Sequence, residues 1–144
     1  MAVAIQVTFD CADPAAQASF WAQALGYVVQ PPPEGYESWE KFLGAIGVPE
    51  NQWNSANAIV DPKGLGPRIY FQRVPEAKTA KNRVHLDVNA GGGHDVDDQE
   101  RRQRVDDAAQ RLAGLGATFV EERTERGERW IVMQDPEGNE FCLQ

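Results

Sequence analysis

The sequence has few of the residues that typify secreted or nucleic-acid-binding proteins. Its two cysteines, Cys11 and Cys142, are too few for a disulfide framework. Only 14 basic residues accompany 22 acidic ones, and the net charge of -8 repels a phosphate backbone or an anionic bilayer. We find neither a basic leader over residues 1–9 nor an apolar run near the roughly 20 residues of a membrane span. We therefore expect a cytoplasmic protein that binds neither nucleic acid nor membranes.

The composition favours a folded chain. Hydrophobic residues make up 42% of the 144 residues and charged residues 25%, so a substantial core can form. This length fits one ordinary domain and is too short for two. We expect a single domain over residues 1–144.

The first half of the chain predicts a strand, a helix and further strands. Residues 5–10 are β-branched and aromatic, as in a strand. A helix follows Asp13, a typical N-cap, and ends before Gly26, which tolerates a left-handed backbone. Strands are also predicted over residues 56–60 and 68–74.

The second half repeats this order. Strands are predicted over residues 83–89, 118–122, 129–134 and 140–143, with a helix over 98–113. Residues 5–10 align with 84–89, and the turn at residues 61–64 aligns with the turn at 135–138. We interpret this as a duplicated βαβββ unit, with module one over residues 1–78 and module two over 82–144. The alternative is a ferredoxin-like α+β sandwich with chance similarities.

Residues 30–54 have no regular pattern, because three consecutive prolines at 31–33 exclude a helix there. Four large rings lie in or beside this irregular stretch: Tyr36, Trp39, Phe42 and Trp53. They either cover the mouth of a cavity, pack in the core or at a dimer interface, or stack on a planar ligand.

Two groups of charged residues allow more than one interpretation. Arg68 and Arg73 either hold an anionic ligand or pair with surface acids. The group formed by His94, Asp95, Asp97 and Asp98 resembles a metal cluster, but it directly precedes a predicted helix. Carboxylates at that position cap free N–H groups, and we expect this structural role.

Several motifs in order resemble one known superfamily. They are Phe9-Asp10-Cys11-Ala12-Asp13-Pro14, Phe20-Trp21, Leu25-Gly26-Tyr27, Asn82-Arg83-Val84-His85-Leu86-Asp87, Leu115-Gly116-Ala117 and the stretch from Asp135 to Leu143. The chain resembles the vicinal-oxygen-chelate superfamily, and within it the glyoxalase-like, bleomycin-resistance-type domains common in actinobacteria. This resemblance implies an α+β fold in which two βαβββ modules form an eight-stranded, partly open mixed β-barrel with helices outside. It also implies a homodimer and a cavity that in some members holds a divalent metal.

The resemblance places the metal-ligand positions on the first and last strands of each module. These positions fall on Gln6, His85 and Cys142, together with Tyr70 or, in a register shifted by two, Gln72. The equivalent of Cys142 in glyoxalase I enzymes is a glutamate. In this chain, Glu140 is the only carboxylate that we expect near these positions, because it lies one pleat from Cys142 on the same face of the strand.

A ligand set of Gln6, His85 and Cys142 carries little negative charge for a divalent ion. The cofactor is therefore either absent or a metal, with zinc or copper favoured over magnesium. His85 is either a cavity-lining ligand or acid–base residue, or a core histidine bonded to Gln6. Cys142 is either a buried inert thiol or a nucleophile whose pKa is lowered by His85.

Three functions follow from these considerations. The first is binding of a small aromatic or vicinal-oxygen ligand without classical glyoxalase I activity. The residues expected to contact that ligand are Gln6, Tyr70, Gln72, His85, Cys142, Trp39 and Trp53. The second is a metal-dependent lyase or isomerase that uses Gln6, His85 and Cys142, with His85 as the catalytic residue. The third is an interaction protein whose function is its dimer surface.

Overall fold

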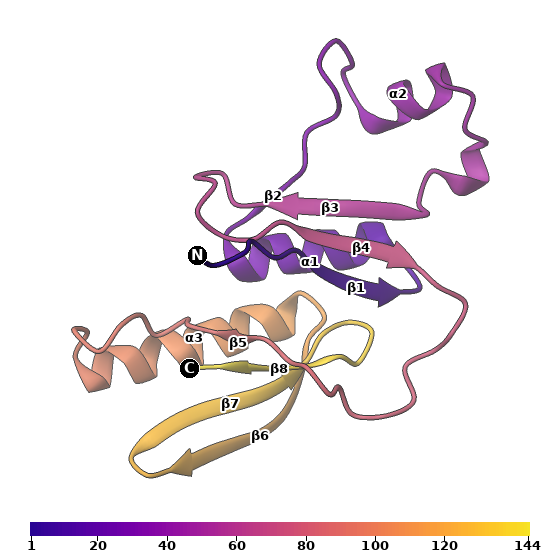
Figure 1. Cartoon of the computed structure of the whole chain (residues 1–144). Coiled ribbons are helices and arrows are strands. Elements are labelled where there is room, and N and C mark those ends of the chain that lie inside the picture. Colours follow the sequence, from indigo (N-terminus) through magenta and orange to yellow (C-terminus); the bar gives the residue numbers. More distant parts are fainter. The chain divides into compact units, whose positions relative to one another are not determined.

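The computed structural model describes residues 1–144. Its eight strands form two four-stranded mixed sheets (Figure 1). The chain divides into two compact units, Met1–Ala77 and Lys78–Gln144, which we call the N-terminal unit and the C-terminal unit.

The N-terminal unit has one sheet in the strand order β1-β4-β3-β2, in which β1 runs parallel to β4. Its elements are β1 (Val7–Cys11), α1 (Pro14–Leu25), β2 (Val28–Val29), α2 (Trp39–Ala45), the 3-10 helix η1 (Glu50–Gln52), β3 (Ala56–Val60) and β4 (Ile69–Arg73). Asp13 caps α1 by accepting a hydrogen bond from the Ala16 N–H, and Gly26 ends the helix at a φ of 70°. Both helix ends therefore lie where the sequence predicts them.

The core of this unit lies between α1 and one face of the sheet. Phe9 on β1 contacts Trp21 of α1 and Phe71 of β4, with ring centroids 5.1 and 5.4 Å apart. Trp21 and Phe71 are fully buried. Because side chains alternate along a strand, Gln6, Thr8 and Tyr70 belong to the opposite face, which α1 does not cover.

The C-terminal unit repeats the same topology. Its elements are β5 (Asp87–Val88), α3 (Asp98–Gly114), β6 (Thr118–Glu125), β7 (Glu128–Gln134) and β8 (Glu140–Leu143). The strand order is β5-β8-β7-β6, with β5 parallel to β8. When the strands are counted within each unit, both sheets therefore have the order first, fourth, third, second. This repeat confirms two βαβββ modules and an α+β fold, and it excludes a single ferredoxin-like sheet.

Helix α3 confirms the structural interpretation of the acidic group before it. Its buried residues are Val105, Ala109 and Leu112. The Asp97 carboxylate accepts hydrogen bonds from the N–H groups of Gln99 and Glu100. Asp98 pairs with two arginines of the first helical turns. These carboxylates therefore start the helix, as expected.

Three elements differ from the predictions. Strand β5 contains only Asp87 and Val88 of the predicted 83–89 strand. The two-residue strand β2 was not predicted. Helix α2 occupies part of the segment without a regular pattern, and Ser38 caps it by accepting from the Lys41 N–H.

None of the three α-helices combines the length and the hydropathy needed to cross a bilayer.

Candidate functional site

The N-terminal unit contains a cavity of about 700 Å³ on the sheet face that α1 leaves uncovered. Its walls come from β2, β3, β4, η1, α2, the first turn of α1 and the chain that leads from β2 to α2. Figure 1 shows α2 beyond the β2–β3 edge of this sheet. The volume lies within the range of about 300–1,000 Å³ that is typical of small-molecule pockets.

Aromatic side chains form much of the wall. Trp39, Trp53 and Tyr70 line the cavity, whereas Gln6 and Gln72, the other N-terminal members of the predicted ligand-contact set, do not. The Trp39 indole N–H donates to the Gln30 carbonyl at 2.7 Å, and the Trp53 indole N–H donates to the Val48 carbonyl at 2.9 Å. Because each N–H is already bonded to the backbone, the two ring planes are fixed before any ligand arrives.

The other two rings of this segment have a packing role. Phe42 packs edge-on against Tyr36 and Trp39, with centroid distances of 5.2 and 5.8 Å. Neither Tyr36 nor Phe42 lines the cavity. The four rings thus divide between local packing and the cavity wall.

Arg68 is the one basic residue among the polar residues that line the cavity, which also include Glu40 and neutral side chains such as Asn57. The Arg68 Nε donates to Gln30 Oε1 at 2.7 Å, and its Nη1 donates to Gln6 Oε1 at 2.8 Å. The guanidinium carbon lies 5.3 Å from the Tyr70 ring centroid. No carboxylate pairs with Arg68, so the expected pairing with a surface acid is wrong for this residue. Arg73 also lacks an acidic partner and donates to Ser55 Oγ instead.

Strand register decides between the two candidates in β4. Thr8 of β1 pairs with Tyr70 of β4, and Asp87 of β5 pairs with Cys142 of β8. Thr8 and Asp87 correspond in the aligned halves of the sequence. Tyr70, and not Gln72, is therefore the counterpart of Cys142.

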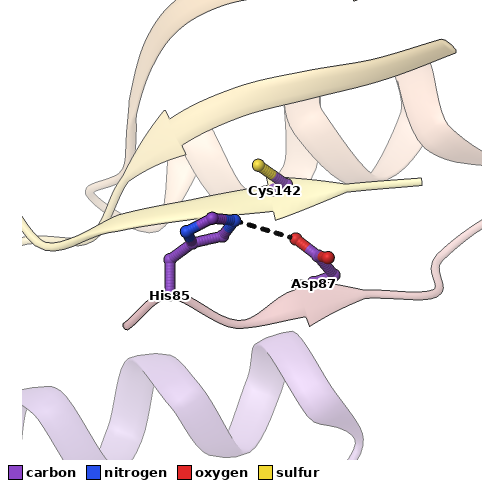
Figure 2. A group of neighbouring side chains, drawn as sticks. All are labelled: His85, Asp87 and Cys142. Atoms are coloured by element: carbon purple, nitrogen blue, oxygen red, sulfur yellow. Dashed lines mark ion pairs between the residues drawn. The ribbon is translucent and has the colours of Figure 1, made fainter. Parts of the chain in front are cut away.

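In the C-terminal unit, His85, Asp87 and Cys142 lie together (Figure 2). His85 Nε2 is 3.3 Å from Asp87 Oδ1, and one potential ligand atom from each of the three residues lies within 4.8 Å of the other two. His85 and Asp87 are both exposed, whereas Cys142 is buried. We call this group the His–Asp–Cys cluster.

The environment of Cys142 keeps its thiol protonated. Burial raises the pKa of Cys142, and the negative charge of Asp87 raises this pKa further. A nucleophilic cysteine needs the opposite change, because the thiolate is the reactive form. The raised pKa agrees with a buried, inert thiol and not with the alternative of a nucleophile activated by His85.

Glu140 has a structural role. Its carboxylate pairs with Lys78 Nζ at 3.1 Å and accepts a hydrogen bond from the Asn82 N–H at 2.9 Å. Burial by itself would raise the pKa of Glu140, but these partners outweigh it and lower the pKa to about 2. The carboxylate thus holds residues 78–82 against the start of β8.

Sequence reasoning missed Asp87, although a signal was present. Glu140 was expected to be the only nearby carboxylate, and this expectation is wrong. In a strand, residues two apart point to the same side, so His85-Leu86-Asp87 already indicates a paired histidine and carboxylate.

Comparisons with known proteins agree with this repeated topology. The sequence model of the glyoxalase-like domain family matches residues 6–144. This chain belongs to the glyoxalase-like domain family. Comparison with curated proteins found no significant match.

Solved structures share the glyoxalase-like fold at low sequence identity. A glyoxalase/bleomycin resistance protein/dioxygenase family enzyme from Burkholderia phytofirmans is 17% identical, with a TM-score of 0.59 over 96% of this chain and 94% of that one. FosX from Listeria monocytogenes, a fosfomycin resistance protein solved with Mn(II) and a dihydroxypropylphosphonic acid, is 16% identical with a TM-score of 0.61, covering 100% and 90%. Hypothetical protein SA1046 from S. aureus is 15% identical with a TM-score of 0.58, covering 99% and 96%.

The metal that the family resemblance implies does not fit the N-terminal positions of this glyoxalase-like chain. The ligating atom of Gln6 would be Oε1, but that oxygen accepts a hydrogen bond from the Arg68 guanidinium. The same cation lies beside the Tyr70 ring. A fixed positive charge at this distance repels a divalent ion. That Gln6 and His85 share one cavity remains a prediction.

Proposed function

We propose that this glyoxalase-like protein binds a small, flat aromatic molecule that carries an anionic group, in the cavity of the N-terminal unit. The observation that carries the proposal is an arginine without an acidic partner beside three aromatic side chains in one cavity. Stacking on Trp39, Trp53 or Tyr70 would bury the ring of the ligand. Arg68 would bind its carboxylate or phosphonate.

The energetics favour an anion over a neutral ligand. Hydrogen bonds to a charged group contribute roughly 1.5–3 kcal/mol each, about twice the value for neutral pairs. Gln6 and Gln30 already orient the guanidinium, so little side-chain entropy is lost when a ligand binds. The two amide oxygens are neutral and do not cancel the charge of Arg68.

We also propose that classical glyoxalase I activity is absent. That reaction moves a proton between adjacent carbons and needs a carboxylate base at the position of Cys142. A neutral thiol with a raised pKa is a poor substitute. We expect no turnover of a glyoxalase I substrate, with or without added zinc.

Calorimetric titration with cinnamate and with its neutral amide, cinnamamide, tests the ligand proposal. We expect cinnamate to bind more tightly, and Arg68→Gln to weaken cinnamate binding about tenfold or more while changing cinnamamide binding less than about twofold. Arg83→Gln is a matched control, because Arg83 is exposed and makes no ion pair. Equal affinity for the two compounds, or no binding of either, would contradict the proposal.

A second candidate function is a metal-dependent lyase or isomerase. The His–Asp–Cys cluster favours it, because these three side chains can bind a metal and exchange protons. Turnover of a vicinal-oxygen substrate that disappears in His85→Ala would support this function over simple binding.

Homodimer formation and a cytoplasmic location also remain proposals. Both cysteines are free and buried, which is compatible with a reducing compartment. Sedimentation equilibrium of the purified chain tests the dimer, and a monomer at micromolar concentration would contradict it.

A further inference from the structure

We propose that the cavity of the N-terminal unit selects a zwitterionic aromatic molecule, whose protonated amino group binds Glu40 while its anionic group binds Arg68. This inference rests on the proposed function, because it concerns the same cavity. It narrows the ligand from an aromatic anion to an aromatic compound that carries one charge of each sign, such as an amino-substituted aromatic acid.

The charges on the cavity wall carry this inference. Glu40 and Arg68 are the two charged residues that line the cavity. They do not pair with each other, and neither forms an ion pair with another residue. The other polar residues of the wall are neutral: Gln30, Ser38, Gln52, Asn54, Ser55 and Asn57. A ligand with only a negative charge would bind Arg68 but be repelled by Glu40, whereas a zwitterion complements both charges.

Gln30 connects the parts of the wall that carry the two charges. Its main-chain carbonyl accepts the indole N–H of Trp39, the residue before Glu40, at 2.7 Å. Its side-chain Oε1 accepts the Nε–H of Arg68, also at 2.7 Å. The Gln30 N–H donates to the Ala58 carbonyl of β3 at 2.9 Å, which attaches Gln30 to the sheet. One residue therefore positions both the start of α2 and the guanidinium before a ligand binds.

The aromatic wall also suits a positive charge beside Glu40. Trp39 and Trp53 both line the cavity. The face of an indole ring attracts a cation, and this attraction is strongest where water is excluded. A protonated amino group would therefore have a carboxylate and indole faces in the same cavity, while Arg68 accounts for the anionic end of the ligand.

Glu40 has an alternative, purely structural role. It lies in the first turn of α2, where a negative charge is favourable at the N-terminal end of the helix. The two roles have different consequences when the charge is removed. Loss of support for α2 would weaken the binding of every ligand, whereas loss of a ligand contact would weaken only ligands that carry the amino group.

Calorimetric titration of the full-length protein at pH 7 with two matched pairs of ligands tests the inference. The first pair is 3-phenylpropanoate and phenylalanine, and the second is benzoate and 4-(aminomethyl)benzoate. The members of each pair differ by one protonated amino group, which is beside the carboxylate in the first pair and across the ring in the second. In at least one pair we expect the amino compound to bind about three- to fivefold more tightly, as for a solvent-exposed ion pair.

A matched pair of variants assigns this preference to Glu40. We expect Glu40→Gln to abolish the preference for the amino compound and to strengthen binding of the simple carboxylate about twofold, because a repelling charge is removed. Glu37→Gln is the control, since Glu37 precedes the same helix, is exposed, forms no ion pair and does not line the cavity. It should change the ratio of the two affinities less than about 1.5-fold.

Three outcomes would overturn the inference: no preference for the amino compound in either pair, a preference that survives in Glu40→Gln, or equal weakening of both members of a pair by Glu40→Gln. In each case, carboxylate binding that still depends on Arg68 leaves the proposed function intact. Absence of binding for cinnamate and for all four of these compounds would instead contradict the proposed function and this inference together.

Discussion

Removing the charge of Glu140 should destabilise the C-terminal unit. The Glu140 carboxylate is 14% exposed, accepts the Asn82 N–H and pairs with Lys78. Glu140→Gln retains the size of the side chain but replaces one carboxylate oxygen with an amide nitrogen, which cannot accept a hydrogen bond. The segment that leads into the His–Asp–Cys cluster would then lose its attachment to β8.

The magnitude follows from the pKa of this carboxylate. Its pKa is about 2, compared with an ordinary value of 4.5. At 1.36 kcal/mol for each tenfold change in proton affinity, the ionised form contributes about 3 kcal/mol to the free energy of unfolding. We expect Glu140→Gln to lower this free energy by about 2–3 kcal/mol at pH 7.

The pH dependence has a definite sign. Because the folded pKa of Glu140 is depressed, its contribution is fully present well above pH 4.5 and is lost as the pH falls through about 2. Urea unfolding of wild type and Glu140→Gln at pH 7 and pH 3 should show a difference that shrinks to about 1 kcal/mol at the lower pH. Glu125→Gln, on an exposed glutamate without an ion pair, is the control. A difference below about 0.5 kcal/mol at pH 7, or one that does not change with pH, would refute the reasoning.

Three further predictions concern other positions. Asp135 is buried and accepts hydrogen bonds from the backbone N–H groups of Glu137 and Asn139 and from the Asn139 side-chain amide, so Asp135→Ala should lower the free energy of unfolding by about 2–4 kcal/mol in urea titrations, and Asp61→Ala in the more exposed equivalent turn by less. Asn54→Ala should raise the pKa of Asp13, because the Asn54 amide is the main cause of its lowering; an unchanged carboxyl titration by NMR would contradict this. Cys142 should react with iodoacetamide at pH 7 far more slowly in the folded protein than in urea, and similar rates would show that its thiol is neither buried nor raised in pKa.

Regular patterns in the sequence predict regular parts of the fold. Strand β3 spans Ala56–Val60 and β8 spans Glu140–Leu143, as predicted. Helix α3 was predicted to within one residue, because Val105, Ala109 and Leu112 repeat at helical spacing and an acidic N-cap precedes it. Local periodicity and capping carry this information, so a single sequence is sufficient.

The candidate sites depend on contacts that local patterns do not encode. The place of Trp39 and Trp53 in one cavity wall results from their bonds to the backbone carbonyls of Gln30 and Val48. Arg68 finds two glutamine oxygens instead of an acid. The partners of Arg68 lie 38 and 62 residues away, and those of the two tryptophans lie in a segment without a regular pattern, so periodicity cannot identify either set. Asp87 is the exception, because its spacing of two residues from His85 in the predicted 83–89 strand places both side chains on one side.

The two modules share one topology but differ in chemistry at equivalent positions. The equivalent pairs are Gln6 and His85, Thr8 and Asp87, Arg68 and Glu140, and Tyr70 and Cys142. In the N-terminal module the charged member is a cation, held by glutamine oxygens next to an aromatic ring, which favours an organic anion. In the C-terminal module the equivalent carboxylate pairs with Lys78 and accepts the Asn82 N–H, and a different carboxylate, Asp87, lies beside His85 and Cys142. Substitution at a few open-face positions of a duplicated sheet therefore gives the two modules different side-chain chemistry, while their strand order stays the same.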